Sequence, residues 1–214
     1  YKEDVAWLTE LGLPVVIYDK SGNPLSSPGP GTRIQPLPNI GRETHSYLWH
    51  IVNNYNQLAE HTLFTQAHPF DHLAPKTGPR ELRDMVLGLA ARKVHFKGLA
   101  WFTLKCDHLG RPHDMREASH KGKWAGWGRD IPVGEVYEKL FSGPVPEQFH
   151  VRAPAGVFLA SRERIHTRPL ALYQRALDLI LADPDDAHNT GHAFERLWYL
   201  ILNGNTRINR ASYD

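Results

Sequence analysis

The chain has 214 residues, is 41% hydrophobic and carries a formal net charge of +2 at pH 7. This length and composition suit one large globular domain and exclude disordered and collagen-like proteins. The small net charge gives no basic excess of the kind that nucleic-acid binding demands. No apolar run approaches the ~18 residues of a membrane span, which indicates a soluble protein.

Two features bear on the cellular compartment. The single cysteine, Cys106, cannot form an intramolecular disulfide, which favours the reducing cytoplasm. The chain begins Tyr1-Lys2-Glu3-Asp4 without a Met or a signal peptide, so we expect the domain to be cut before its first strand. A Golgi or secretory-lumen location therefore stays open beside the cytoplasmic one.

Strands and helices are expected to alternate through the first half of the chain. A β-branched run over 15–18 predicts a strand, and the five Pro and three Gly of residues 21–38 predict an irregular loop after it. Apolar spacing predicts two helices and two further strands, the helices over 43–55 and 80–92 and the strands over 62–65 and 99–104.

The second half begins with a segment without clear periodicity, residues 107–132, which we interpret as a long functional loop or lid. After it the pattern predicts a helix over 133–141, a buried strand over 156–160, a helix over 170–181 and a last helix from an N-cap at Thr190 to Leu202. This alternation predicts a single α/β domain over 1–214, with a mainly parallel central sheet flanked by helices. In such a sheet, ligands bind outside the carboxyl ends of the strands.

The segment that leads into the predicted helix at 43–55 has the composition of an anion site. It reads Asn39-Ile40-Gly41-Arg42-Glu43, and a glycine at a helix N-terminus lets backbone N–H groups approach a ligand. Arg42 adds a planar donor suited to phosphate or carboxylate. Ordinary helix capping by Asn39, Arg42 and Glu43 is the alternative interpretation.

The same motif carries a resemblance that extends over nearly the whole chain. The sequence resembles a domain family of unknown function common in fungi and also found in bacteria and plants, through its Tyr-Lys-Glu-Asp start with Trp7 after it, its Asn-x-Gly-Arg-Glu helix entry and the Glu195-Arg196-Leu197-Trp198 motif of the last helix. The Asn-x-Gly-Arg entry is also similar to that of rhamnan-synthesis-type glycosyltransferases. That similarity implies the nucleotide-diphospho-sugar transferase fold called GT-A.

The resemblance implies roles for several residues. Those expected to bind the nucleotide are Glu3, Asp4, Asp19, Asn39, Gly41 and Arg42, while Gln66 and the segment up to His72 are expected to face the diphosphate. Glu195 is expected to act as the general base, because a Glu near a Trp can have its pKa raised by desolvation. A solvent-facing pair of Glu195 with Arg196 is the alternative.

Two further groups complete the candidate site. His68, Asp71 and His72 form a cluster that could hold a divalent metal such as Mn²⁺ or Mg²⁺, although paired His in a polar loop also serve as surface hydrogen-bonding groups. Trp124 and Trp127 lie among Lys and Gly in a segment typical of a stacking and phosphate-binding surface.

These features favour a transferase that moves a sugar from a nucleotide-sugar donor to an acceptor. Glycosyltransferases with the GT-A fold usually carry an Asp-x-Asp motif, where this chain has Gln66-Ala67-His68. Two alternatives therefore stay open. One is an aminoacyl-tRNA-dependent enzyme that forms acyl or peptide bonds on the same scaffold, and the other is a noncatalytic carbohydrate- or nucleotide-binding module.

Overall fold

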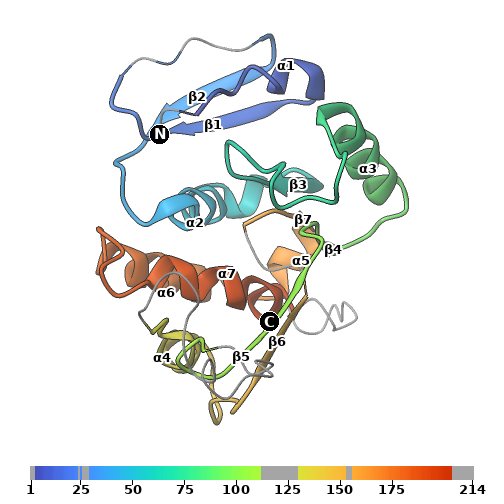
Figure 1. The fold of residues 1–214 in the computed structure, drawn as a ribbon. Coiled ribbons are helices and arrows are strands. Elements are labelled where there is room, and N and C mark those ends of the chain that lie inside the picture. The colour runs from blue at the N-terminus through green and yellow to red at the C-terminus, as the bar shows by residue number, and fades with distance from the viewer. Residues whose placement is uncertain (1–2, 24, 26–28, 112–129, 153–155, 204–214) are drawn as a thin grey trace.

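The computed structural model describes residues 3–23, 25, 29–111, 130–152 and 156–203, which form a single domain of mixed helices and strands (Figure 1). In chain order its elements are α1 (Leu8–Leu11), β1 (Val15–Asp19), β2 (Thr32–Pro36), α2 (Arg42–Asn54), the 3-10 helix η1 (Tyr55–Gln57), β3 (His61–Phe64), α3 (Pro79–Ala91), β4 (Phe96–Gly98), β5 (Thr103–Cys106), α4 (Val133–Leu140), β6 (Phe149–Arg152), β7 (Phe158–Ser161), α5 (Arg162–His166), α6 (Leu170–Leu181) and α7 (Thr190–Ile201). Within this part of the chain, none of the helices has the length and apolar character that a membrane-spanning segment requires.

The strands form three small sheets, and the prediction of a mainly parallel central sheet is wrong. The central sheet has the order β3-β7-β4, and both of its strand pairs are antiparallel. Strands β5 and β6 also pair antiparallel. Among the described strands, only β1 and β2 run parallel, with Val15 opposite Thr32.

The apolar run of the central strand β7 led to the wrong prediction of strand direction. Side chains alternate across a strand, so Phe158 and Ala160 join one hydrophobic cluster, while Val157, just before the strand, and Leu159 join another. All four side chains are buried. A continuous apolar run is typical of parallel strands covered on both faces, but an antiparallel strand between two covered faces has the same pattern.

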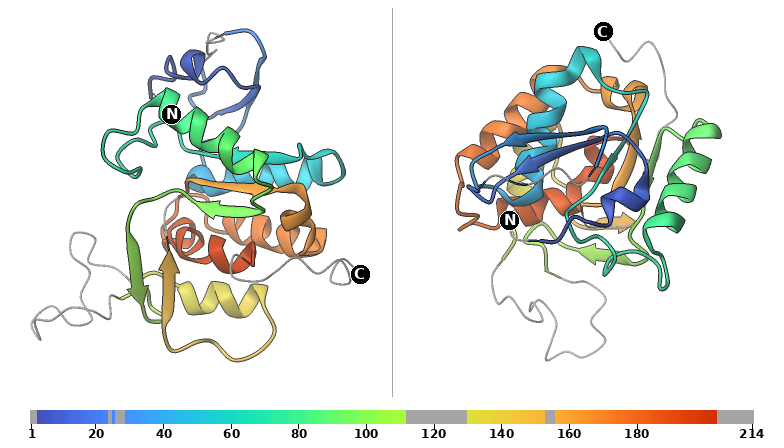
Figure 2. Two further views of the ribbon diagram at one scale, coloured as in Figure 1. Left: turned by 90° about the vertical axis from the view of Figure 1, so that its right-hand side faces the viewer. Right: turned by 90° about the horizontal axis from the view of Figure 1, so that it is seen from above.

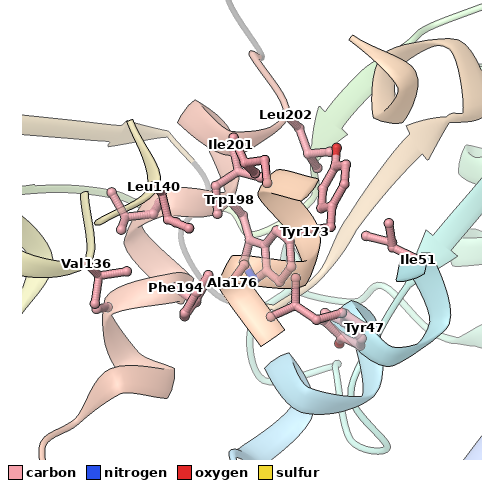
Figure 3. Close-up of a cluster of buried hydrophobic side chains, with 14 of the residues drawn as sticks. Tyr47, Ile51, Val136, Leu140, Tyr173, Ala176, Phe194, Trp198, Ile201 and Leu202 are labelled. Carbon is pink, nitrogen blue, oxygen red and sulfur yellow. The ribbon is translucent and has the colours of Figure 1, made fainter. Parts of the chain in front are cut away.

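The larger cluster lies between the central sheet and helices α2, α4, α6 and α7. Figure 3 shows its side chains, with Tyr47 and Ile51 from α2, Tyr173 and Ala176 from α6, and Trp198 from α7 converging on one another. The Tyr47 hydroxyl donates a 2.6 Å hydrogen bond to the carbonyl of Gly156, just before β7. This bond ties the first half of α2 to the start of the central strand.

The smaller cluster lies on the opposite face of the sheet. Helix α3 covers that face, whereas α6 and α7 lie on the other side of β4 and β7 (Figure 2). Helix α1 packs against α3 through Leu8 and Leu11. The indole N–H of Trp7 donates to the Ala67 carbonyl at 2.9 Å, so the N-terminal segment is fastened to the loop that follows β3.

Most predicted helices are confirmed, whereas several predicted loops and strands need correction. The amphipathic helices α2, α3, α4, α6 and α7 begin and end within one or two residues of the prediction. The predicted loop 21–38 contains strand β2, which is stabilised by its pairing with β1. Of the predicted strand 99–104, only residues 103 and 104 lie in a strand, β5. Strands β4 and β6 were missed, because short strands depend on partners that are distant in the sequence.

Two details at loop and helix ends also differ from the prediction. Thr190 is the first residue of α7, and Asn189, with φ of 59°, takes the N-cap position. Of the predicted lid 107–132, residues 112–129 lie outside the described residues. Arg111 and Asp130, the described residues on either side of that segment, form two hydrogen bonds of 2.6 and 2.8 Å with each other.

The start of α2 leads to a first prediction, on stability. Gly41 has φ of +55°, and a Cβ at this position would overlap with Cγ2 of Ile180 on α6. We expect Gly41→Ala to lower the free energy of unfolding by about 2–4 kcal/mol, because backbone strain and overpacking add. Gly22→Ala is the control, since Gly22 has φ of +74° but no neighbouring atom within 4 Å. Equal losses for both variants in denaturant unfolding would contradict the close contact with α6.

Candidate functional site

The N-terminal ends of α2 and α7 lie side by side, although about 150 residues separate them in the sequence. The Gly41 N–H donates to the Pro184 carbonyl in the loop before α7 at 3.1 Å. Both helices begin on the same side of the molecule in Figure 1. Because a helix N-terminus carries a partial positive charge, this junction favours negatively charged groups.

Arg42, the first residue of α2, contacts three side chains at this junction. Its Nη1 lies 3.1 Å from Nε2 of His192, its Nη2 lies 3.6 Å from Oε1 of Glu195, and its Nε lies 3.8 Å from Oε2 of Glu43. The predicted anion-binding arginine and the predicted general base therefore lie within ion-pair distance of each other. We call the four residues Arg42, Glu43, His192 and Glu195 the junction cluster.

Glu195 occupies an electrostatic environment that favours its protonated form. Burial raises the pKa of this carboxyl above its ordinary value, and the neighbouring Glu43 raises it further. The charges of Arg196 and Arg42 act in the opposite direction. The side chain of Glu195 is 19% exposed, so it is sheltered without being fully enclosed.

Glu43 is held in the same sheltered position from α2. Its side chain is 13% exposed, and its Oε1 is buried without a hydrogen-bond partner. A buried carboxylate oxygen without a donor is costly, so this atom favours the approach of a hydrogen-bond donor. The junction cluster thus combines two sheltered carboxyl groups with one shared arginine.

His192 is fixed by Asp186 in the loop before α7. Its Nδ1 lies 3.1 Å from Oδ2 of Asp186, and the other carboxylate oxygen of Asp186 accepts the Gly191 N–H at 2.7 Å. Arginine has only donors, so Nε2 of His192 must accept from Arg42 and the ring proton must lie on Nδ1. This assignment makes His192 a neutral ring that links Asp186 to Arg42.

Lys20, which follows β1, holds the backbone where α2 begins. Its ammonium group donates to the Ile40 carbonyl at 2.6 Å and to the carbonyl of Arg42. Burial lowers the pKa of Lys20 to about 8, and the negative charge of Glu43 partly opposes this shift. Arg42 has φ of 53°, an uncommon conformation for a residue with a Cβ, and the lysine stabilises it by binding the carbonyls on both sides of Gly41.

The junction cluster lies at the end of the central sheet where β3 finishes and β7 starts. A Cβ at Gly156 would lie 2.9 Å from Cγ of Glu43, which shows how closely α2 approaches this end. Phe64, the last residue of β3, pairs with Phe158. The loop that begins at Gln66 therefore leaves the sheet at the end that Glu43 approaches.

The remaining predicted nucleotide-binding residues lie outside the junction cluster. Glu3, Asp4 and Asn39 are exposed, and the carboxylate of Asp4 accepts the N–H of Ala6 at 2.8 Å. The carboxylate of Asp19 accepts the Ser21 N–H at 2.9 Å and so shapes the turn after β1. These residues keep their proposed ligand roles as predictions.

The segment from Gln66 to His72, predicted to face the diphosphate, lies in the described part of the chain. The amide of Gln66 donates to the carbonyl of His68 at 3.1 Å, which stabilises the turn after β3. Trp124 and Trp127 lie outside the described residues.

The predicted metal site is only partly assembled. Nε2 of His68 and Oδ2 of Asp71 lie 3.6 Å apart with both side chains largely exposed, while the His72 ring lies beside Phe102. Across the ranges that the structure describes, no group of three or more His, Cys, Asp or Glu side chains is arranged to hold a metal ion. The geometry therefore gives the predicted metal ligands His68, Asp71 and His72 no support.

Sequence reasoning missed three residues of this region: Glu43, Asp186 and His192. Only His192 left a signal that could have been used, because it precedes Glu195 by three residues and so lies on the same face of the last helix. Glu43 was interpreted as an ordinary helix-start residue. Its carboxyl becomes significant because α7 places Glu195 beside it.

The buried His45 next to this site leads to a prediction of pH dependence. Burial lowers its pKa from the ordinary 6.5 to about 4, and the charge of Lys20 contributes. The unfolded chain then binds a proton that the folded chain does not, so stability is lost as the pH falls from about 6.5 to 4. Between pH 7 and 4, the parent should lose up to about 3 kcal/mol more than His45→Gln in denaturant unfolding.

His68→Gln removes an exposed imidazole and serves as the control for this measurement. A constant difference in unfolding free energy between the parent and His45→Gln across this pH range would show that the buried ring does not control the acid sensitivity.

Comparison with known proteins gives one match. No curated protein and no solved structure matches the chain significantly. A family model described as "Protein of unknown function (DUF3431)" matches residues 1–213, and the chain therefore belongs to the DUF3431 family.

Proposed function

We propose that this protein transfers a sugar from a nucleotide-linked donor to an acceptor hydroxyl, with Glu195 as the proton acceptor. The observation that carries the proposal is the placement of Glu195 beside Arg42, at the junction of two helix N-termini. In the reaction, the acceptor oxygen bonds to the anomeric carbon while the bond from that carbon to the diphosphate breaks. The electron pair of that bond leaves with the nucleoside diphosphate, and Glu195 takes the hydroxyl proton.

The position of Glu195 suits a general base. Its helix is held by the buried side chains of Phe194, Leu197 and Trp198, so the carboxyl is presented from a rigid element. Burial and the charge of Glu43 raise the pKa of Glu195 toward neutral pH. A general base is most effective when its pKa lies near the pH at which the enzyme works. Its partial exposure leaves it within reach of an acceptor.

Arg42 and the start of α2 supply the complementary feature for the donor. A guanidinium group can bind two phosphate oxygens at once, and the helix dipole adds favourable potential at the same place. The left-handed conformations of Gly41 and Arg42 turn this segment sharply into the helix. A diphosphate bound here would lie next to the proposed base.

The resemblance to rhamnan-synthesis-type enzymes supports the sugar-transfer proposal through the Asn39–Arg42 entry. The small and mostly antiparallel sheets give no support to the GT-A comparison, so the proposal rests on the junction cluster and on this motif. A nucleotide-binding module without catalysis shares the Arg42 site and differs in the role of Glu195. The two variants below separate these functions.

Removal of the Arg42 side chain tests the donor site. We expect Arg42→Ala to weaken the binding of a nucleoside diphosphate at least tenfold in titration calorimetry, because a charge-assisted hydrogen bond contributes about 1.5–3 kcal/mol. Uridine, guanosine and adenosine diphosphates are the probes. Arg80→Ala is the matched control, since Arg80 is exposed on α3 and pairs only loosely with Glu10 at 3.6 Å. Equal affinities for parent and Arg42→Ala would reject the site.

Substitution of the proposed base separates an enzyme from a binding module. Glu195→Gln keeps the shape of the side chain and removes its basicity, so turnover of a nucleotide sugar should fall about 10²–10⁴-fold while donor binding is retained. Glu135→Gln on α4, which removes an exposed carboxylate paired with Lys139, should behave like the parent. If Glu195→Gln lowers the melting temperature but leaves turnover per folded molecule unchanged, Glu195 is a structural residue.

A further inference from the structure

The three nitrogen atoms of the Arg42 guanidinium are not held equally. The 3.1 Å contact of Nη1 with His192 has hydrogen-bond length, whereas the contacts with Glu195 and Glu43 are 3.6 and 3.8 Å. Hydrogen bonds between a cation and a carboxylate are usually ~2.7–2.9 Å long. Arg42 is thus anchored by the neutral ring, and its contacts with the two carboxyl groups are electrostatic and loose.

The anchor itself is well supported. Asp186 accepts from His192 and from the Gly191 N–H, so the ring is fixed at the first turn of α7. Arg42 can therefore keep its bond to His192 while the edge of the guanidinium that faces Glu195 changes partner. An anion with two or more oxygens is the natural replacement, because it can approach that edge more closely than the two glutamates do.

The charged and polar groups that face Glu195 come from both helices. On α2 these groups are Arg42, Glu43 and the buried hydroxyl of Tyr47, and on α7 they are His192 and Arg196. Arg196 lies 3.7 Å from Oε2 of Glu195 and also donates to the His192 carbonyl at 2.7 Å. If Arg42 turns to another anion, Glu195 keeps one cationic neighbour and still faces Glu43. The pair of carboxyl groups then carries more negative charge than its surroundings balance.

We propose that Arg42 couples anion binding to proton uptake: an anion that pairs with Arg42 displaces it from Glu43 and Glu195, and this pair of glutamates takes up one proton. The inference rests on the anion site of the proposed function and adds the regulation of its base. When a fully ionised anion such as inorganic pyrophosphate binds, the proton comes from solvent. The diphosphate of an intact nucleotide sugar carries less negative charge, so in sugar transfer the pair takes the proton from the acceptor hydroxyl while the charge of the leaving diphosphate develops. As negative charge develops on the leaving diphosphate, Arg42 follows that charge and Glu195 becomes the better proton acceptor.

Thermodynamic linkage gives this coupling a measurable size. If one proton is taken up with the anion, affinity falls by up to tenfold for each unit by which the pH rises above the titration of the glutamate pair. The coupling is reciprocal, so loss of the Arg42 charge alone must make Glu195 easier to protonate. This second consequence requires no ligand.

The ligand-free experiment measures the titration of Glu195 by carbon NMR in ¹³C-labelled protein. Arg42→Met keeps the length of the side chain and removes its charge, so the Glu195 carboxyl should titrate at a higher pH than in the parent. Arg80→Met is the matched control, and Arg42→Gln is a second variant in case Arg42→Met fails to fold. A Glu195 titration that stays in place or moves to lower pH in the Arg42 variants overturns the coupling.

The ligand-bound experiment titrates the protein with inorganic pyrophosphate in two buffers of different ionisation enthalpy. The difference in heat reports proton uptake, which should approach one proton in the parent and fall strongly in Glu195→Gln and Glu43→Gln. Binding without proton uptake in the parent overturns the coupling and leaves the proposed anion site intact. A raised Glu195 titration in Arg42→Met without any pyrophosphate binding overturns the proposed anion site instead, and with it the anion-binding half of this inference.

Discussion

Burial of β7 on both faces is the constraint on which the rest of this structure depends. Phe158 and Ala160 face one cluster, and Leu159 faces the other, so two separate groups of helices are needed to keep this strand from water. Helices α2, α6 and α7 cover the first face, with α4 packed against α6 and α7, and α1 and α3 cover the second. The three-stranded sheet is small, but it lies between two groups of helices.

This layering also brings the junction cluster together. Tyr47 spans from α2 to the backbone before β7, and α2 and α7 both pack on the larger cluster. Their first turns therefore meet at the edge of that core, where side chains can be sheltered without being fully enclosed. Polar groups in such a position cost stability unless they are paired, and the shared arginine reduces that cost.

The junction cluster and its neighbours differ in how closely their groups contact one another. Asp186 accepts the Gly191 N–H at 2.7 Å, and His192 lies 3.1 Å from both Asp186 and Arg42, so these groups are joined by contacts of hydrogen-bond length. Lys20 stabilises the backbone turn before α2 by donating to the carbonyls of Ile40 and Arg42. The two glutamates have the loosest contacts, and these are the groups to which the proposed chemistry assigns a proton.

The sequence by itself determined the helices and much of the core. An amphipathic helix buries one stripe whatever its partner, so helical spacing was enough to place α2, α3, α6 and α7 and to identify Ile51, Ile180 and Trp198 as inward-facing. It also singled out Arg42 and Glu195 as separate candidates. Each could be predicted as a candidate from its residue type and its position in its own helix.

Only the tertiary structure decided strand direction and the composition of the site. The apolar sequence pattern of β7 is the same whether its neighbouring strands run parallel or antiparallel. Packing on both faces of the sheet sets its partners β3 and β4. Arg42 and His192 are 150 residues apart, so no local pattern could show their contact. The electrostatic state of Glu195 depends on Glu43 and on burial at the α2–α7 junction. Electrostatic forces act over a few ångströms in space, and a one-dimensional pattern records only the residues, not these distances.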